Sequence, residues 1–184
     1  MAGDGAPAVF LDRDGTLMVD VGYPRDPADV RLLDGAADAL VQLRNAGFRL
    51  VLVSNQAGIG RGLITEAEAR SVHERFVAEL ARRGARLDDA RYCPHAPDAG
   101  CDCRKPAPGM LLAAAGDLGL DLEASFMIGD KATDVEAGRR AGCRTVLFAP
   151  DGTPSDGGSP GHADHVARTW TDALGFVLRS GAHA

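Results

Sequence analysis

Short apolar runs alternate with amphipathic segments along most of the chain. Apolar runs of four to six residues are typical of buried strands, and apolar residues spaced three or four apart are typical of helices packed on a sheet. The runs that predict strands are residues 8–11, 48–53, 89–93, 125–128 and 144–148. The segments that predict helices are residues 35–45, 65–83, 108–118 and 133–141. This alternation predicts an α/β protein with a Rossmann-like, doubly wound parallel sheet in three layers.

The rest of the pattern predicts a single domain over residues 1–184. We expect a core from about residue 8 to residue 150, followed by a linker and a C-terminal helix within residues 151–184. Residues 149–161 are rich in Pro, Gly, Asp and Ser and predict a loop, residues 165–167 a short edge strand, and residues 171–178 the final helix. Asp34 is expected to cap the first helix, and Thr65 with Glu68 forms a capping-box pattern at the second.

Composition narrows the class of protein. Hydrophobic residues are 45% of the 184 residues and charged residues 25%, which are values of globular proteins. Twenty Lys and Arg against 26 Asp and Glu leave a net charge of −6, which excludes a chain-wide surface for nucleic acid or for an anionic membrane. No apolar run approaches the roughly 20 residues of a membrane span, and the first ten residues lack the pattern of a signal peptide. We therefore expect a cytoplasmic monomer.

Polar side chains follow the strands at their carboxyl ends. Asp12 and Asp14 come after the first predicted strand, and Asp130 and Asp134 come after the fourth. Because ligands of an open α/β sheet bind beyond the carboxyl ends of the strands, these carboxylates are expected at one rim. Four carboxylates that close repel one another unless a cation neutralises them, and hard oxygen ligands favour Mg²⁺. Taken singly, each aspartate could instead be a helix cap or a loop residue.

Cations and hydrogen-bond donors are expected at the same rim. Ser54 and Asn55 follow the second strand, where a hydroxyl and free backbone N–H groups can hold a phosphoryl oxygen. Lys105 and Lys131 are the only lysines among 20 basic residues, which suggests that a compact ammonium is needed at both positions. The alternatives are a turn that uses Ser54 and Asn55 for its own hydrogen bonds, and a solvated basic pair at Arg104 and Lys105.

A compact Cys/His segment precedes Arg104. Cys93, His95, Cys101 and Cys103 supply three thiolates and one imidazole, which together satisfy tetrahedral Zn²⁺ without an open position. Such a site is structural, and it would hold a loop that lacks a core of its own. The alternatives are free thiols or two fortuitous disulfides. Cys143 stands apart and is expected to be a small buried residue.

The motifs in their order resemble the haloacid dehalogenase superfamily of phosphohydrolases. They are residues 12–16 (DRDGT), Ser54-Asn55, Lys105-Pro106 and Gly129-Asp130 with Asp134, and the resemblance covers about residues 8–150. It implies that Asp12 is the nucleophile that forms an aspartyl-phosphate and that Asp14 is the general acid and base. It implies further that Ser54 and Lys105 stabilise the phosphoryl group. The Mg²⁺ ligands would be Asp12, the backbone carbonyl of Asp14 and Asp130, with Asp134 supporting the metal from behind.

Motif spacing and the Cys/His loop narrow the resemblance. The segments between motifs are too short for a cap domain, so specificity is expected to come from short loops. A Cys/His loop directly before Arg-Lys-Pro resembles the branch that holds heptose-bisphosphate and histidinol-phosphate phosphatases. Within that branch, residues 20–24 and 55–62 resemble the heptose enzymes. The residues expected to contact a small phosphorylated sugar, with no nucleic acid or membrane partner, are Arg13, Asp20, Tyr23, Asn55, Gln56, Arg61, Arg104 and Lys131.

The resemblance implies removal of the 7-phosphate from D-glycero-D-manno-heptose 1,7-bisphosphate. Three other functions stay open on the sequence alone. One is a histidinol-phosphate phosphatase, and a second is a catalytically silent binding protein, which the presence of both Asp12 and Asp14 disfavours. The third is a nucleic-acid 3′-phosphatase, which the acidic net charge disfavours.

Overall fold

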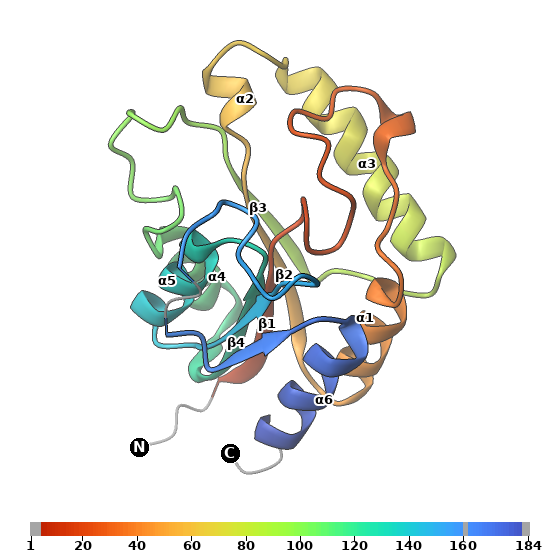
Figure 1. Ribbon diagram of the computed structural model, residues 1–184, viewed down its shortest axis with the longest axis vertical. Helices are drawn as coiled ribbons and strands as arrows, with labels where there is room; N and C mark the ends of the chain where they lie inside the picture. Colours follow the sequence, from red (N-terminus) through yellow and green to blue (C-terminus); the bar gives the residue numbers. More distant parts are fainter. Residues whose placement is uncertain (1–4, 160–161, 182–184) are drawn as a thin grey trace.

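A six-stranded sheet forms the centre of the molecule (Figure 1). The computed structural model describes residues 5–159 and 162–181. The strands are β1 (Ala6–Leu11), β2 (Arg49–Asn55), β3 (Asp89–Cys93), β4 (Leu120–Gly129), β5 (Arg144–Phe148) and β6 (His165–Ala167). They lie in the order β3-β2-β1-β4-β5-β6, and every neighbouring pair is parallel. This is the doubly wound arrangement that the sequence predicts, with its switch point between β1 and β4.

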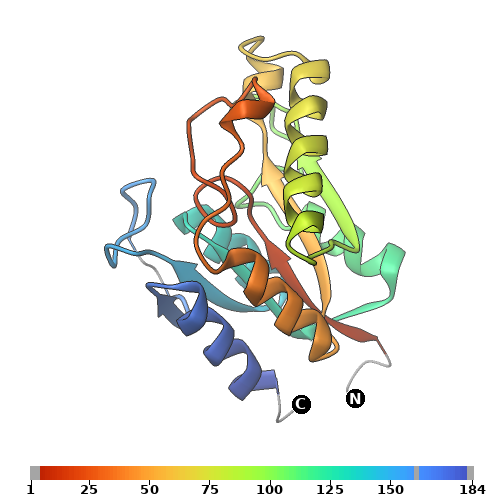
Figure 2. The same ribbon diagram turned by 90° about the vertical axis from the view of Figure 1, so that its right-hand side faces the viewer.

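Helices cover both faces of the sheet (Figures 1 and 2). One face carries α4 and α5, and the other carries α1, α3 and α6. The helices are α1 (Ala36–Asn45), α2 (Ala57–Gly60), α3 (Glu66–Arg82), α4 (Gly109–Leu118), α5 (Ala132–Ala141) and α6 (Trp170–Gly181), and a 3-10 turn η1 spans Pro27–Asp29. No helix within the described ranges is long and apolar enough to cross a bilayer.

Alternation along β1 divides the buried side chains into two cores. Val9 and Leu11 pack in the larger core beneath α1, α3 and α6, while Ala8 and Phe10 pack in the core beneath α4 and α5. All four side chains are fully buried, as expected for a central strand of a parallel sheet. The central position of β1 fixes the place of the residues that follow it.

Most predicted elements are confirmed, and three details differ. Thr65 and Glu68 form the expected capping box, but Gly35, with φ of 77°, occupies the N-cap of α1 in place of Asp34. The short helix α2 and the turn η1 were not predicted, because both lie in loops without apolar periodicity. Strand β4 starts five residues before the predicted 125–128 run, since the polar residues at its start pair with the beginning of β1.

Trp170 joins the C-terminal helix to the loop after β1. The ring is 1% exposed, stacks on Phe148 at a centroid distance of 5.3 Å, and donates from Nε1 to the carbonyl oxygen of Thr16 at 2.9 Å. We predict that Trp170→Ala lowers the free energy of unfolding by about 3–5 kcal/mol, because it removes both packing and the hydrogen bond. Leu112→Ala, at a side chain 46% exposed, should change it by less than about 1 kcal/mol. Urea unfolding followed by circular dichroism measures both, and equal losses would refute this role for Trp170.

Candidate active site and metal centre

The ends of β1, β2 and β4 bring the predicted rim residues together. They line one small hollow at the switch point of the sheet, together with the start of α5 and the loop before α4. The lining residues are Asp12, Asp14, Ser54, Asn55, Lys105, Lys131, Thr133 and Asp134. Asp130 adjoins them, since one oxygen each of Asp12, Asp130 and Asp134 fall within 4.8 Å of one another.

Lys105 forms ion pairs with two of these carboxylates. Its ammonium lies 2.7 Å from Asp12 Oδ1 and 2.6 Å from Asp134 Oδ1, and it donates to the carbonyl oxygen of Val53 at 2.7 Å. An ammonium has three protons to donate, so all three are satisfied. Burial would lower the pKa of Lys105, but the charges of Asp12 and Asp134 outweigh that effect and raise it. The residue is therefore a fixed cation beside Asp12.

Asp130 has no lysine partner of this kind. The side chain is 2% exposed and accepts hydrogen bonds from the hydroxyls of Thr16, at 3.2 Å, and Ser155. Burial, followed by the nearby charge of Asp12, raises the pKa of Asp130 to about 7. Such a carboxylate gains from a bound cation, because the cation would favour its charged form. The carboxylate oxygens of Asp12 and Asp130, within 4.8 Å of each other, are hard donors that fit a Mg²⁺ ion.

Two glycines make room for the carboxylates. A side chain at Gly15, where φ is 84°, would collide with Asp130 Oδ2. One at Gly129 would collide with the Asp134 carboxyl group. Both positions therefore need glycine for the close approach, and Gly15 also needs it for its left-handed backbone conformation.

Asn55 and Gln56, expected to contact substrate, hydrogen-bond to other site residues. The Asn55 amide donates to the Lys105 carbonyl and accepts from the Lys105 N–H, both at 3.0 Å. Gln56 Nε2 donates to Asp14 Oδ2 at 2.8 Å and to Ser54 Oγ at 3.1 Å. Asn55 thus ties β2 to the loop that carries Lys105, and Gln56 ties Ser54 to Asp14.

Arg13 and Arg104 differ in their accessibility. Arg13, expected to contact substrate, is 1% exposed and forms two hydrogen bonds with Asp14, so in this conformation its charge faces Asp14. Arg104 is partly buried, and its Nη1 is a buried nitrogen for which the described residues supply no hydrogen-bond partner. An unpartnered guanidinium nitrogen suits an anionic ligand.

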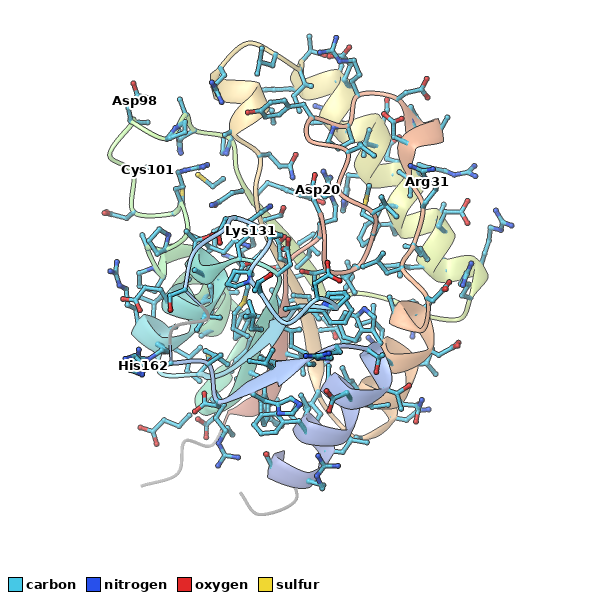
Figure 3. The ribbon with its side chains drawn as sticks, viewed as in Figure 1. Asp20, Arg31, Asp98, Cys101, Lys131 and His162 are labelled. Atoms are coloured by element: carbon cyan, nitrogen blue, oxygen red, sulfur yellow. The ribbon has the colours of Figure 1, made fainter. Side chains whose placement is uncertain are left out.

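Two loop pairs lie beside the hollow. Arg61 Nη1 donates to the Tyr23 hydroxyl at 2.7 Å, which links the loop after β1 to the segment after β2. Lys131 and Asp20 are labelled in Figure 3. Lys131 Nζ lies 3.4 Å from Asp20 Oδ2, and both side chains are about one third exposed. All four residues are at least partly exposed, and Lys131 also lines the hollow.

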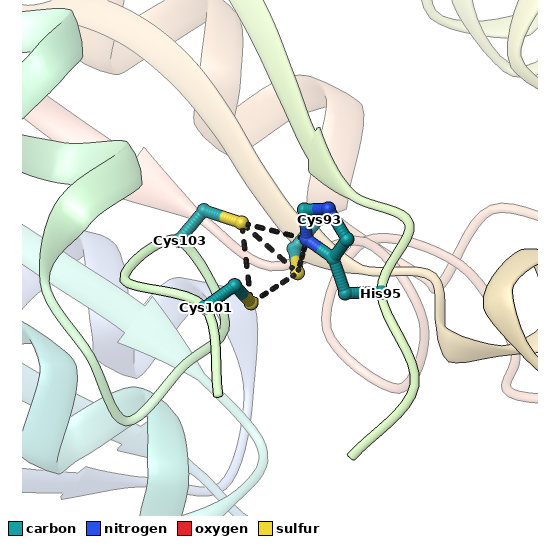
Figure 4. Close-up of side chains that lie close together, drawn as sticks. All are labelled: Cys93, His95, Cys101 and Cys103. Carbon is teal, nitrogen blue, oxygen red and sulfur yellow. Dashed lines mark hydrogen bonds between the residues drawn. The ribbon is translucent and has the colours of Figure 1, made fainter. Parts of the chain in front are cut away.

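The four predicted zinc ligands meet in one cluster (Figure 4). The sulfur atoms of Cys93, Cys101 and Cys103 lie 3.2–3.6 Å apart, and His95 Nδ1 lies 3.2 Å from Cys103 Sγ. Zinc–sulfur bonds of about 2.3 Å in a tetrahedron place sulfurs about 3.8 Å apart, so the donor set fits Zn²⁺. All four cysteines of the chain are free of disulfides, and Cys143 is buried elsewhere, where burial raises its pKa to about 12.

The Cys/His loop packs against both ends of α2. Gly60 N–H donates to the Pro94 carbonyl and Gln56 N–H donates to the Cys93 carbonyl, both at 2.8 Å. A side chain at Gly60 would come within 2.5 Å of the backbone of Ala96. Figure 3 shows Asp98 and Cys101 on this loop, between β3 and α4. The loop therefore connects the segment of Arg61 to the segment of Arg104 and Lys105.

Sequence reasoning missed Thr133 and Ser155 at the site. Thr133 lines the hollow from the first turn of α5, and it stands between two residues that were singled out. Ser155 reaches Asp130 from the loop after β5, where its backbone N–H also donates to the Asp130 carbonyl at 2.8 Å. The Pro- and Gly-rich sequence of that loop carried no signal for either contact.

We predict that Gly129→Ala destabilises the protein because the added methyl group would displace Asp134 from Lys105. The loss in free energy of unfolding should be about 1–3 kcal/mol, as for other overpacked core positions. Gly116→Ala is the matched control, since Gly116 lies in α4 with open space around it and should stabilise by about 0.5–1 kcal/mol. Thermal and urea unfolding of both variants test this, and a Gly129→Ala protein as stable as Gly116→Ala would contradict it.

Comparisons with known proteins identify relatives of this chain. A HAD-hydrolase-like family model matches residues 102–173. The D-glycero-β-D-manno-heptose-1,7-bisphosphate 7-phosphatase of Photorhabdus laumondii is 46% identical over 157 residues, which covers 82% of this chain and 84% of that protein. The enzyme of the same name from Escherichia coli K12 is 42% identical over 173 residues, covering 90% of this chain and 91% of that protein.

Solved structures show the same fold. The D,D-heptose 1,7-bisphosphate phosphatase from B. bronchiseptica, complexed with magnesium and phosphate, superposes with a TM-score of 0.84 at 32% identity, covering 94% of this chain and 98% of that one. A HAD-like phosphatase from Mesorhizobium loti superposes with a TM-score of 0.81 at 35% identity, covering 97% and 87%. With its capless sheet and its Cys/His loop, the chain belongs to the heptose-1,7-bisphosphate phosphatase family of HAD-like hydrolases.

Proposed function

We propose that this protein removes the 7-phosphate of D-glycero-β-D-manno-heptose 1,7-bisphosphate and leaves the 1-phosphate in place. The observation that carries the proposal is the Asp12 carboxylate held by Lys105 beside Asp14, in a chain 42–46% identical to enzymes named for this reaction. The preference for the β-anomer comes from those names, since the sequence alone favours neither anomer. Histidinol phosphate is the substrate to compare, because it belongs to the other branch with a Cys/His loop.

In the first step, Asp12 attacks the phosphorus of the 7-phosphate. A P–O bond forms to Asp12, the bond to the sugar oxygen breaks, and Asp14 gives a proton to that oxygen as it leaves. Burial, the largest effect on Asp14, raises its pKa and so favours the protonated form that this step needs. Lys105 and the Ser54 hydroxyl stabilise the charge on the equatorial phosphoryl oxygens.

In the second step, water hydrolyses the aspartyl-phosphate. Asp14, now a carboxylate, takes a proton from the water as its oxygen attacks phosphorus. The bond between Asp12 and phosphorus breaks, inorganic phosphate leaves, and the Asp12 carboxylate is restored. The same residue thus serves as acid and then as base.

Mg²⁺ would be held by Asp12, Asp130 and the backbone carbonyl of Asp14. Bound there, it would neutralise charge on the phosphoryl group during transfer. Asp134 supports the metal site through hydrogen bonds and not as a ligand, because its oxygens are engaged by Lys105 and by the Lys131 N–H, the latter at 3.0 Å. The magnesium and phosphate in the B. bronchiseptica relative support this assignment.

Recognition of the sugar and of its second phosphate falls to the rim. Arg104, with its unpartnered nitrogen, and Lys131 are the cations available for the phosphate that is not transferred. Asp20, Tyr23 and Arg61 supply carboxylate, hydroxyl and guanidinium partners, respectively, for sugar hydroxyls. A single domain over residues 1–184, a monomer and a cytoplasmic location stay predictions from the sequence.

We predict that the protein releases phosphate from the β-anomer of the bisphosphate in the presence of Mg²⁺. The kcat/KM for the β-anomer should exceed that for the α-anomer and that for histidinol phosphate by at least about tenfold. Asp12→Asn should lose turnover while the fold persists, because an amide cannot attack phosphorus. Steady-state phosphate release measures all of these rates. A higher kcat/KM on histidinol phosphate would reject the substrate, and an Asp12→Asn variant with more than a few per cent of the wild-type kcat would reject the mechanism.

We propose that Cys93, His95, Cys101 and Cys103 hold one structural Zn²⁺ per chain, and metal analysis tests this. Cys101→Ser should lose most of the zinc, since it removes one of four thiolate or imidazole ligands. Cys143→Ser is the control, because Cys143 is buried away from the cluster and its variant should keep the full zinc content. Stoichiometric zinc in Cys101→Ser would sink the assignment.

Lys105 and Arg104 should separate chemistry from recognition. Lys105→Ala should lower kcat by about two to three orders of magnitude, because its charge lies beside the reacting carboxylate. Lys105→Arg should not restore kcat, since a planar fork cannot replace a compact ammonium in a closed site. Arg104→Ala should raise KM with little change in kcat, and the effect should be smaller on a monophosphate. Kinetics of these variants on both substrates decide; equal losses of kcat at the two positions would contradict the division of roles.

A further inference from the structure

Arg13 is a buried cation whose charge is directed at Asp14. It is 1% exposed, and its Nε and Nη2 donate to Asp14 Oδ1 and Oδ2, each at 3.0 Å. The two parallel hydrogen bonds hold the carboxylate by both oxygens, which a lysine could not do. Burying the charge of an arginine is costly unless a partner offsets it, and the partner of Arg13 is the Asp14 carboxylate.

Two further residues hold the guanidinium itself. Arg13 lies over the ring of Tyr92, 5.7 Å from its centroid, and the Tyr92 hydroxyl lies 2.6 Å from His73 Nδ1. Burial, and then the charge of Arg13, lowers the pKa of His73, which favours a neutral ring that can accept a hydrogen bond from the Tyr92 hydroxyl. A chain of contacts thus runs from α3 through β3 to Arg13.

Gln56 completes the restraint on Asp14. Its Nε2 donates to Asp14 Oδ2 at 2.8 Å, from the segment that follows β2. With both oxygens held by Arg13 and one also by Gln56, the carboxylate cannot rotate without breaking hydrogen bonds. Proton transfer needs an oxygen within hydrogen-bond reach of the reacting group, and small misplacements are costly.

We propose that Arg13, packed on Tyr92, is a positioning residue that fixes the Asp14 carboxylate for proton transfer to the leaving oxygen and from water. The inference rests on the function proposed for Asp14. It replaces the substrate contact that the sequence suggested for Arg13, and it adds Tyr92 and His73 as the outer support of the catalytic loop.

Two other roles for Arg13 predict different outcomes. An ion pair that only stabilises the fold would affect kcat equally whether or not Asp14 is present. A restraint that holds Asp14 away from the leaving oxygen would make kcat rise when Arg13 is weakened. Positioning predicts a loss of kcat that depends on Asp14.

The first experiment is a double-mutant cycle of Arg13→Met and Asp14→Asn, measured on heptose 1,7-bisphosphate with Mg²⁺. Arg13→Met should lower kcat by about 10- to 100-fold with KM within about threefold, and Arg13→Lys should recover only part of the loss. In the Asp14→Asn background the same substitution should change kcat by less than about twofold. Arg91→Met is the control, because Arg91 is the neighbour of Tyr92 in the sequence. The variant loses ion pairs with Asp89 and with Asp117 and should keep the wild-type kcat.

The second measurement uses p-nitrophenyl phosphate, whose leaving group departs as a stable anion. In Arg13→Met the first turnover should then be nearly as fast as in wild type, followed by slow hydrolysis of the aspartyl-phosphate, which appears as a burst of nitrophenolate. Circular dichroism checks the fold of each variant. If Arg13→Met does not fold, Arg13→Lys and Tyr92→Phe enter the same cycle and burst assay.

The outcomes separate this inference from the proposed function. Equal losses of kcat in both backgrounds, a rise in kcat, or a first turnover slowed as much on the aryl phosphate as on the sugar would overturn the positioning role. An Asp14→Asn variant with near wild-type kcat would instead overturn the role proposed for Asp14 itself.

Discussion

The mutual repulsion of Asp12, Asp130 and Asp134 is the constraint on which this site depends. One oxygen of each falls within 4.8 Å of the others, and all three side chains are at most 4% exposed. Lys105 offsets part of that repulsion by bridging Asp12 and Asp134, while Asp130 relies on hydroxyl donors and carries a raised pKa of about 7. The site therefore keeps Asp130 in need of a cation, beside an Asp12 carboxylate that shares the single charge of Lys105 with Asp134. That imbalance is what makes the site suited to a metal and a phosphoryl group.

Several neighbouring parts of the structure hold Lys105 in place. Asn55, at the end of β2, forms two hydrogen bonds with the backbone of Lys105. The Val53 carbonyl oxygen accepts the third hydrogen bond from the Lys105 ammonium. The Cys/His cluster lies immediately before it in the chain and packs on α2. Cys93 belongs to the core beneath α4 and α5, with Cys101 and Cys103 packed against it, so a bound zinc would tie this loop to that core. The doubly wound order brings β1 and β4 side by side, which sets Asp12 next to Asp130. The order of the strands, the loop that carries Lys105 and the Cys/His cluster thus all help to position the Lys105 ammonium.

The sequence predicted what depends on period and motif, and it missed what depends on side-chain direction. Strand β3 and the capping box at Thr65 followed from local pattern alone. Arg13 was expected to contact substrate because a charged residue between two aspartates looks accessible, whereas the structure buries it against Asp14. Asn55 was placed among substrate contacts because the pattern shows the end of a strand and not which loop returns to it. Ser155 could not be predicted, since only the folded chain brings its loop onto Asp130.

The free energy of unfolding of Lys105→Met, Asp134→Asn and the double variant, measured in urea without Mg²⁺, tests this account most directly. Breaking a buried pair by removing one partner costs about 3–5 kcal/mol because it leaves an uncompensated charge. The account predicts a loss of that size for Lys105→Met. It also predicts a double variant more stable than the sum of the single losses by at least about 1 kcal/mol, because the neutral amide introduced by Asp134→Asn relieves the repulsion that Lys105 no longer offsets. Additive losses, or a Lys105→Met protein as stable as wild type, would show that carboxylate repulsion does not govern the site.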